Sequence, residues 1–223
     1  MLMNYNYNSS ISVKLNILSI LYEFFNNFIK DFGFVCTPGC NTCCTVDVVC
    51  TTLETSFLLR NINVSPDIIP NKYYKPNISI NKSASLYLKG QIPPAEESKR
   101  ALSPCPLLTQ EGLCSIYPYR PFACRAMISR TICKKGEEAD IPPFLVYVSL
   151  VFMQIIEHLD KDGYTANLWD IIKNDSKYLV KNHSFPGILV PFEYKARIKS
   201  MIRRILNLEF EGKKLSYYLD ISV

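Results

Sequence analysis

The chain has 223 residues, of which 48% are hydrophobic and 20% charged, and its formal net charge is +5. These values are typical of a globular protein with a core of its own, and so small a charge falls short of the basic stripe of a nucleic-acid-binding protein. Charged and amide side chains interrupt the apolar stretch at residues 11–34, and the first ten residues lack a basic start. We therefore expect no membrane-spanning helix, no signal peptide and a cytoplasmic location.

The first predicted element is an amphipathic helix over residues 11–33, where apolar side chains recur at spacings of three and four. Ser12 is a candidate N-cap, and Gly33 suits the end of the helix. A turn-rich segment follows over residues 36–44. It leads into a second predicted helix, which extends from about residue 42 to residue 61.

Residues 62–106 contain seven of the fourteen prolines, and proline disfavours long helices because it removes a backbone donor and crowds the preceding turn. We expect an irregular segment over the core, with a short strand or hairpin at residues 78–88. Three more helices are predicted, at about residues 143–160, 166–181 and 191–208. The predicted fold is mostly α, with a single domain over residues 1–223. Amphipathic helices (11–32 and 141–210) wrap an irregular cysteine-rich metal-binding core (33–133).

The nine cysteines are the most informative feature of the sequence. An odd number cannot pair completely, and thiols in a reducing compartment stay free or bind metal. Seven of them form two sets, Cys36-x3-Cys40-x2-Cys43-Cys44 and Cys105-x8-Cys114-x9-Cys124. Ligands close in sequence lose little loop entropy when a metal gathers them, so we predict these seven as metal ligands. Cys50 and Cys133 are as compatible with small buried hydrophobic side chains as with ligands.

The chain holds more thiols than one metal site requires. Zinc takes four ligands, and a four-iron cluster takes about four thiolates. Two centres, one larger cluster, or one centre with spare thiols are therefore all open. Adjacent Cys43 and Cys44 would diverge by about 100° on a helix, which favours separate roles for them.

Both cysteine sets lie in a recognisable motif. The second reads Cys105-Pro-Leu-Leu, then Cys114-Ser-Ile-Tyr117-Pro-Tyr-Arg120-Pro121-Phe-Ala-Cys124-Arg125. Together with the first set, it resembles the CxxCxxCC family of zinc- or iron-chelating cysteine-cluster proteins over roughly residues 33–133. Three residues stand between Cys36 and Cys40, where the pattern that names the family has two. The resemblance implies metal chelation, without fixing the metal or the reaction.

Arg120 and Arg125 flank Cys124 in this motif. Their guanidinium groups could offset the charge of a polythiolate centre or donate hydrogen bonds to it, or they could pair with carboxylates. The motif favours a position around the metal for both.

Other potential ligands carry weaker signals. Asp47 and Glu54 follow the first cysteine set at helical distance, and a solvated or ion-paired face suits them better than a ligand role. His158 and His183 lie far from the cysteines in sequence, so exposed or capping roles are expected for both.

Three functional hypotheses follow. The favoured one is an iron–sulfur cluster that serves redox chemistry, iron or sulfur handling, or substrate binding. The second is a structural zinc module that acts through partner interactions. The third is a cluster-dependent enzyme, such as a protein methylase, because flagellin lysine methylases are relatives of the family; no glycine-rich methyl-donor loop is evident. The basic side of residues 191–208 fits a protein partner better than nucleic acid, since it lacks interleaved aromatic residues.

Overall fold

The computed structural model describes residues 9–37, 39–96, 98–134 and 138–221. Helices dominate this part of the chain, which confirms the prediction of a mostly α fold. The α-helices are α1 (Ser9–Ile29), α2 (Thr52–Asn61), α3 (Ile80–Leu88), α4 (Phe122–Ala126), α5 (Pro143–Leu159), α6 (Leu168–Lys173), α7 (Phe192–Leu206) and α8 (Leu215–Leu219). The strands are β1 (Val49–Thr51), β2 (Tyr164–Asn167), β3 (Val180–Lys181), β4 (Glu209–Phe210) and β5 (Lys213–Lys214).

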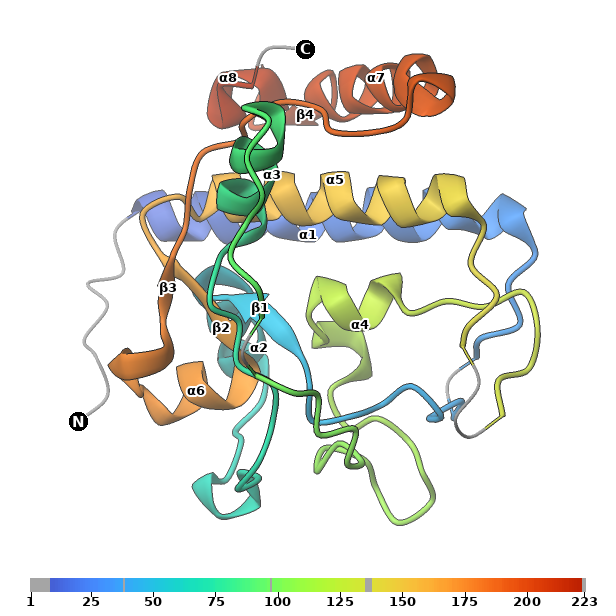
Figure 1. Cartoon of the computed structure of the whole chain (residues 1–223), viewed down its shortest axis with the longest axis vertical. Coiled ribbons are helices and arrows are strands. Elements are labelled where there is room, and N and C mark those ends of the chain that lie inside the picture. Colours follow the sequence, from blue (N-terminus) through green and yellow to red (C-terminus); the bar gives the residue numbers. More distant parts are fainter. Residues whose placement is uncertain (1–8, 38, 97, 135–137, 222–223) are drawn as a thin grey trace.

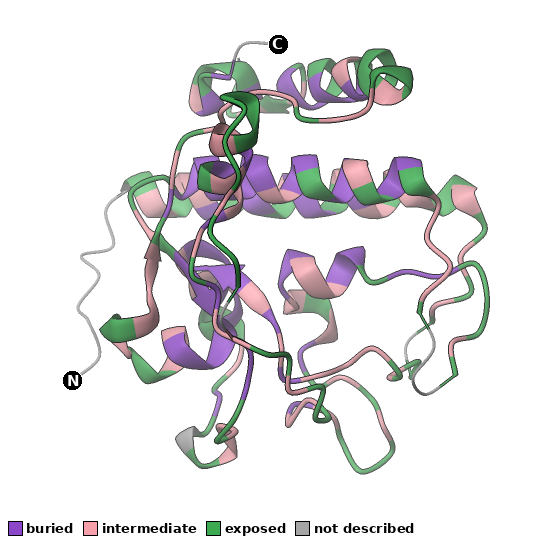
Figure 2. Cartoon of the chain, in the orientation of Figure 1, coloured by how far each residue is buried: buried purple, intermediate pink, exposed green. Residues whose placement is uncertain are grey.

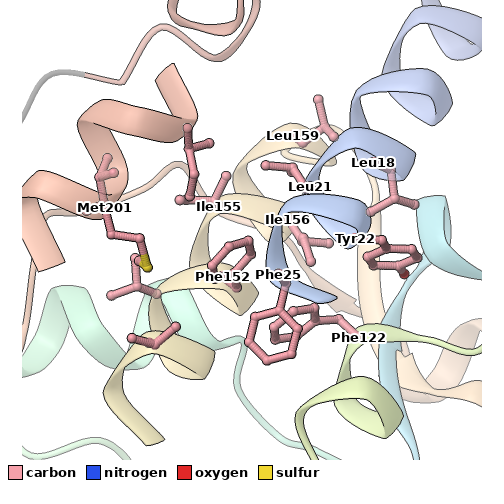
Figure 3. Packing of buried hydrophobic residues seen from close by; sticks show 14 of the residues in the cluster. Leu18, Leu21, Tyr22, Phe25, Phe122, Phe152, Ile155, Ile156, Leu159 and Met201 are labelled. Carbon is pink, nitrogen blue, oxygen red and sulfur yellow. The ribbon is translucent and has the colours of Figure 1, made fainter. Parts of the chain in front are cut away.

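The long helices α1 and α5 lie side by side in the middle of the molecule, with α7 and α8 on one side of them and α4 on the other (Figure 1). Their facing sides form the larger core, in which the rings of Phe25, Phe122 and Phe152 meet (Figure 3). The ring centres are 4.7 Å apart for Phe25 and Phe122, and 5.4 Å apart for Phe122 and Phe152. Burial of each such ring contributes roughly 1.5–3 kcal/mol, so this contact fixes short α4 against the helix pair.

A second, smaller core lies under the sheet. Strands β1, β2 and β3 are antiparallel in that order, and Cys50 is opposite Ala166. Leu58 and Trp169, both fully buried, pack beneath them. The indole Nε1 of Trp169 donates a hydrogen bond of 3.0 Å to the carbonyl oxygen of Val46. This bond anchors the end of the first cysteine loop to the core.

Three predicted helices are confirmed by the structure. The first is α1, continued by a 3-10 turn (Lys30–Phe32) that ends at Gly33 with φ of 68°, a left-handed conformation that glycine adopts readily. The other two are α5, which starts at Pro143, and α7. All three are long segments with a sustained apolar stripe, and α5 is buried along most of its length (Figure 2).

The predicted helix over residues 42–61 is wrong in its first ten residues. Residues 42–48 form turns and a bridge, β1 follows, and α2 begins only at Thr52. A capping box sets this start: the Thr51 side chain accepts from the backbone N–H of Glu54, and the Glu54 carboxylate accepts from the N–H of Thr51. The Thr-x-x-Glu spacing was visible in the sequence and marks the boundary.

Two further predictions were wrong. Residues 78–88 hold helix α3, not a strand or hairpin, and Ser79 caps it by accepting from the N–H of Lys82. Residues 166–181 do not form one helix, because Asn167 ends β2 and caps short α6. Asn174 then takes a left-handed conformation with φ of 56°, which terminates α6.

No helix in the described ranges is both long and apolar enough to cross a membrane.

Candidate metal centre

All nine cysteines lie in described residues, and all carry free thiols. Most of them sit on the loops below α4 and at the outer end of the α1–α5 pair (Figure 1). Figure 2 shows that these loops are largely half-buried or exposed, in contrast to the buried helices behind them. The site is therefore built from irregular backbone held by a helical scaffold.

The first contact between the two cysteine sets is a backbone pairing. The N–H of Cys105 donates to the carbonyl oxygen of Cys44 at 3.0 Å, and the N–H of Val46 donates to Ser103 at 2.9 Å. Asp47 secures this pairing, because its carboxylate accepts from the N–H groups of Tyr74, Ala101 and Leu102 at 2.7, 2.7 and 3.0 Å. Asp47 thus organises the loop, which differs from both roles considered for it from the sequence.

A tight hairpin places Cys114 beside Cys105. Leu108 and Cys114 form an antiparallel bridge, and Thr109 and Gly112 close the turn. Gly112 has φ of 76°, and a Cβ there would lie 2.3 Å from Nδ2 of Asn41. That amide donates 3.1 Å to the carbonyl oxygen of Gly112, so the hairpin touches the first cysteine loop.

Helix α4 supplies the fourth thiol, Cys124. Glu54 is buried and its Oε1 accepts from the N–H of Phe122 at 2.7 Å, at the start of α4. The same carboxylate accepts from Tyr22 on α1 at 2.9 Å. Glu54 therefore joins α1, α2 and α4, and holds α4 where Cys124 faces the loops.

Four thiols, from Cys44, Cys105, Cys114 and Cys124, lie close enough for their charges to act on one another. Burial, followed by the charges of Cys105 and Cys114, raises the pKa of Cys124 to about 12. Burial and then the charge of Cys114 raise the pKa of Cys105. Several thiolates are thus costly here without a cation, and a bound metal would remove that cost.

The neighbouring side chains of Cys43 and Cys44 interact with each other. The thiol of Cys43 donates a hydrogen bond to the sulfur of Cys44, which lowers the pKa of Cys44 and raises that of Cys43. Cys44 is therefore the more acidic thiol and the first to become a thiolate, the form that binds metal.

Cys36 lies apart from the hairpin, against the segment that leaves α4. Its Sγ accepts from the N–H of Ser129 at 3.2 Å, and the N–H of Val35 donates to the carbonyl of Ser129 at 3.0 Å. Thr42 Oγ1 is 3.5 Å from the carbonyl oxygen of Cys133. The structure thereby brings Cys133, whose role the sequence left open, next to the first cysteine loop.

The two arginines of the motif have different surroundings. Arg120 lies over the Tyr117 ring at 3.7 Å, and its positive charge lowers the pKa of Cys43 and of Cys124, although other effects outweigh it there. Arg125 is buried, donates to the carbonyls of Pro118 and Arg120, and covers the Tyr22 ring at 4.1 Å. The charges of Arg120 and Arg125 both act on Cys124, and the contact of Arg125 with the Tyr22 ring also ties the motif to α1.

Cys50 is buried in the smaller core, and its Sγ is 3.4 Å from Thr55 Oγ1. Burial, and then the charge of Glu54, raises its pKa well above the usual value, so it is a poor source of thiolate. The two histidines form hydrogen bonds away from the thiols. The ring of His158 bonds to the carbonyl oxygen of Leu219, and the ring of His183 bonds to the hydroxyl of Ser79.

Within the described part of the chain, no three histidine, cysteine, aspartate or glutamate side chains are arranged so that they could hold a metal ion as they stand. The thiols are neighbours without forming a coordination sphere, so binding requires their side chains to converge. The donor set itself suits a soft metal, because thiolates select zinc and iron–sulfur clusters.

Comparison with known proteins identifies the same segment. Residues 35–141 match the family CxxCxxCC, described as a "putative zinc- or iron-chelating domain". This match confirms the resemblance predicted from the motifs, and it supports metal binding in general terms. Searches of curated proteins and of solved structures return no match.

Proposed function

We propose that this chain, whose residues 35–141 match the CxxCxxCC family, is a cysteine-cluster metalloprotein that binds an iron–sulfur cluster. Cys44, Cys105, Cys114 and Cys124 would hold the cluster, and the mutual proximity of these four thiols is the observation that carries the proposal. A bound cluster supplies one-electron chemistry or an iron open to a substrate. No reaction is assigned to the chain.

The surroundings of these thiols favour a negatively charged group. Four thiolates carry more negative charge than an iron–sulfide core offsets, so a bound cluster would be net negative, and Arg120 lies near enough to influence Cys43 and Cys124. Charges and hydrogen bonds around the sulfurs set the reduction potential of such a centre. Arg120 would therefore tune the cluster, and Arg125 would hold the loop that presents it.

A structural zinc module is the second candidate. The four thiols join three segments, the first cysteine loop, the hairpin and α4, which are connected mainly by backbone bonds between irregular stretches. A tetrahedral zinc would cross-link them, and its binding free energy would become folding free energy. Such a module would act through a protein partner. Either metal needs reduced thiols, as the cytoplasm provides.

Metal and acid-labile sulfide analysis of protein purified without oxygen, together with a visible spectrum, tests the proposal. Iron with matching sulfide and a colour that bleaches on reduction supports the cluster. Zinc without sulfide or colour supports the structural module and refutes the cluster. Cys124→Ala should lose most of the metal, whereas the matched variant Cys50→Ala should retain it. Full occupancy in Cys124→Ala would overturn the ligand assignment.

A further inference from the structure

The described residues place a second set of thiols beside the first. Cys36, Cys40 and Cys43 lie on the loop that leaves α1, and Cys133 lies on the segment that follows α4. The hydrogen bonds from Val35 and Ser129 run between these two segments, and Thr42 contacts the carbonyl of Cys133. Two segments about ninety residues apart in sequence, one with Cys36 and one leading to Cys133, are therefore hydrogen-bonded to each other.

The loop that carries Cys36, Cys40 and Cys43 is folded by two backbone turns. The N–H of Cys40 donates to Thr37 at 3.0 Å, and the N–H of Cys44 donates to Asn41 at 2.9 Å. Two turns in succession thus shorten the path from Cys36 to Cys43. The four thiols also lie close enough to affect one another electrostatically. Burial raises the pKa of Cys36 most, and the charges of Cys40, Cys43 and Cys133 raise it further.

The residues just before Cys133 are bonded to Asp140. The guanidinium group of Arg130 forms a bidentate salt bridge with the carboxylate of Asp140, with nitrogen–oxygen distances of 2.8 and 3.1 Å. The backbone N–H of Arg130 also donates to the carbonyl oxygen of Asp140. Ser129 Oγ accepts from the N–H of Asp140 at 3.0 Å. These bonds hold Ser129 and Arg130, which precede Cys133, in place beside Cys36, and the contact with Thr42 brings Cys133 to the same loop.

We propose that the cysteines form two separate four-thiol metal sites, Cys44 with Cys105, Cys114 and Cys124, and Cys36 with Cys40, Cys43 and Cys133. This inference rests on the proposed function and extends it to a second centre. Adjacent Cys43 and Cys44 serve different sites, and the hydrogen bond between them is lost when both become thiolates. Each group has the four sulfurs that a tetrahedral site or a cluster requires, and buried Cys50 is the ninth thiol.

Cadmium titration of the reduced, metal-free full-length chain tests this partition, because Cd²⁺ is a thiolate-seeking probe with a charge-transfer absorbance. Native mass spectrometry counts the ions bound. We expect two Cd²⁺ per chain for the wild type and for Cys50→Ser, and one tightly bound ion for Cys133→Ser and for Cys124→Ser. Far-ultraviolet circular dichroism checks that each variant is folded.

The outcomes separate the two proposals. No tight binding by the wild type would refute both the metal-binding function and the partition. One ion in the wild type, retained in Cys133→Ser and lost in Cys124→Ser, would refute the second site alone. Two ions in Cys133→Ser would remove Cys133 from the site and overturn the partition, while the function stands.

Discussion

Glu54→Gln is the substitution that most directly tests how the scaffold supports the cysteine loops. The Glu54 side chain is 4% exposed, and its two oxygens accept four hydrogen bonds. Oε1 accepts from the hydroxyl of Tyr22 and the backbone N–H of Phe122, and Oε2 accepts from the backbone N–H and the hydroxyl of Thr51. An amide keeps only one acceptor oxygen, so one of these pairs of donors faces an N–H group instead.

Each pair consists of one hydroxyl, which can turn to accept from the amide N–H, and one backbone N–H, which is left without a partner. A buried unsatisfied donor costs about 1–3 kcal/mol, so Glu54→Gln should lower the free energy of unfolding by about that amount, a sizeable part of the ~5–15 kcal/mol typical of a folded domain. Tyr22→Phe removes one donor and leaves the other bonds of Glu54, so it should cost only about 1 kcal/mol. The two changes should be non-additive, because they affect one network.

Urea unfolding of the reduced, metal-free chain, followed by circular dichroism, measures these differences. Glu23→Gln is the matched control, because Glu23 lies on the exposed face of α1, and it should change stability by less than about 0.5 kcal/mol. Glu54→Gln should also weaken metal binding, since the bond to Phe122 holds the helix that carries Cys124. A loss below about 1 kcal/mol in Glu54→Gln would refute the role of this carboxylate as the junction of three helices.

Three further substitutions probe the core, the hairpin and the pH dependence. Phe122→Ala should lower the free energy of unfolding by about 3–5 kcal/mol in the same urea assay, because the ring fills the contact between α4 and the helix pair; an effect below about 1 kcal/mol would contradict that packing. Gly112→Ala should cost about 1–2 kcal/mol and weaken cadmium binding, since φ is 76° and the new methyl group would displace Asn41; unchanged stability and affinity would contradict the hairpin contact. Burial lowers the pKa of His158, whose Nδ1 accepts from the N–H of Phe185. Between that lowered pKa and about 6.5 the unfolded chain binds more protons, so stability should fall as pH falls through this window. His158→Gln should show a smaller loss between pH 7.5 and 5.5, and an equal loss in both proteins would refute the assignment.

The sequence was sufficient to predict the elements whose signal is long and local. Helices α1, α5 and α7 each carry an apolar stripe over at least four turns, and tertiary contacts only confirm it. Short elements were mispredicted because capping decides them: Thr51 and Glu54 start α2, and Ser79 starts α3 where a short strand or hairpin was predicted. The capping box could have been recognised, whereas the pairing of β1 with β2 depends on residues more than a hundred positions apart.

The same distinction applies to the site. Spacing and motif were enough to propose seven cysteines as ligands, and the match over residues 35–141 confirms the resemblance carried by that motif. Which thiols are neighbours depends on the contact between Cys44 and Cys105 and on the bonds between Val35 and Ser129. Those contacts join segments about sixty and ninety residues apart, and spacing alone carries no information on them. Cys133, alone in sequence, could be placed only by the fold.

Differential alkylation is the most direct test that thiolates hold the metal. The natively folded chain would be treated with iodoacetamide in its metal-loaded and chelator-treated forms, and each cysteine would be quantified by peptide mass spectrometry. We predict that Cys44, Cys105, Cys114 and Cys124 are protected in the loaded form and react after metal removal, while buried Cys50 stays unreactive in both and reports that the fold is intact. Equal reactivity of the four thiols in the two forms would contradict the account.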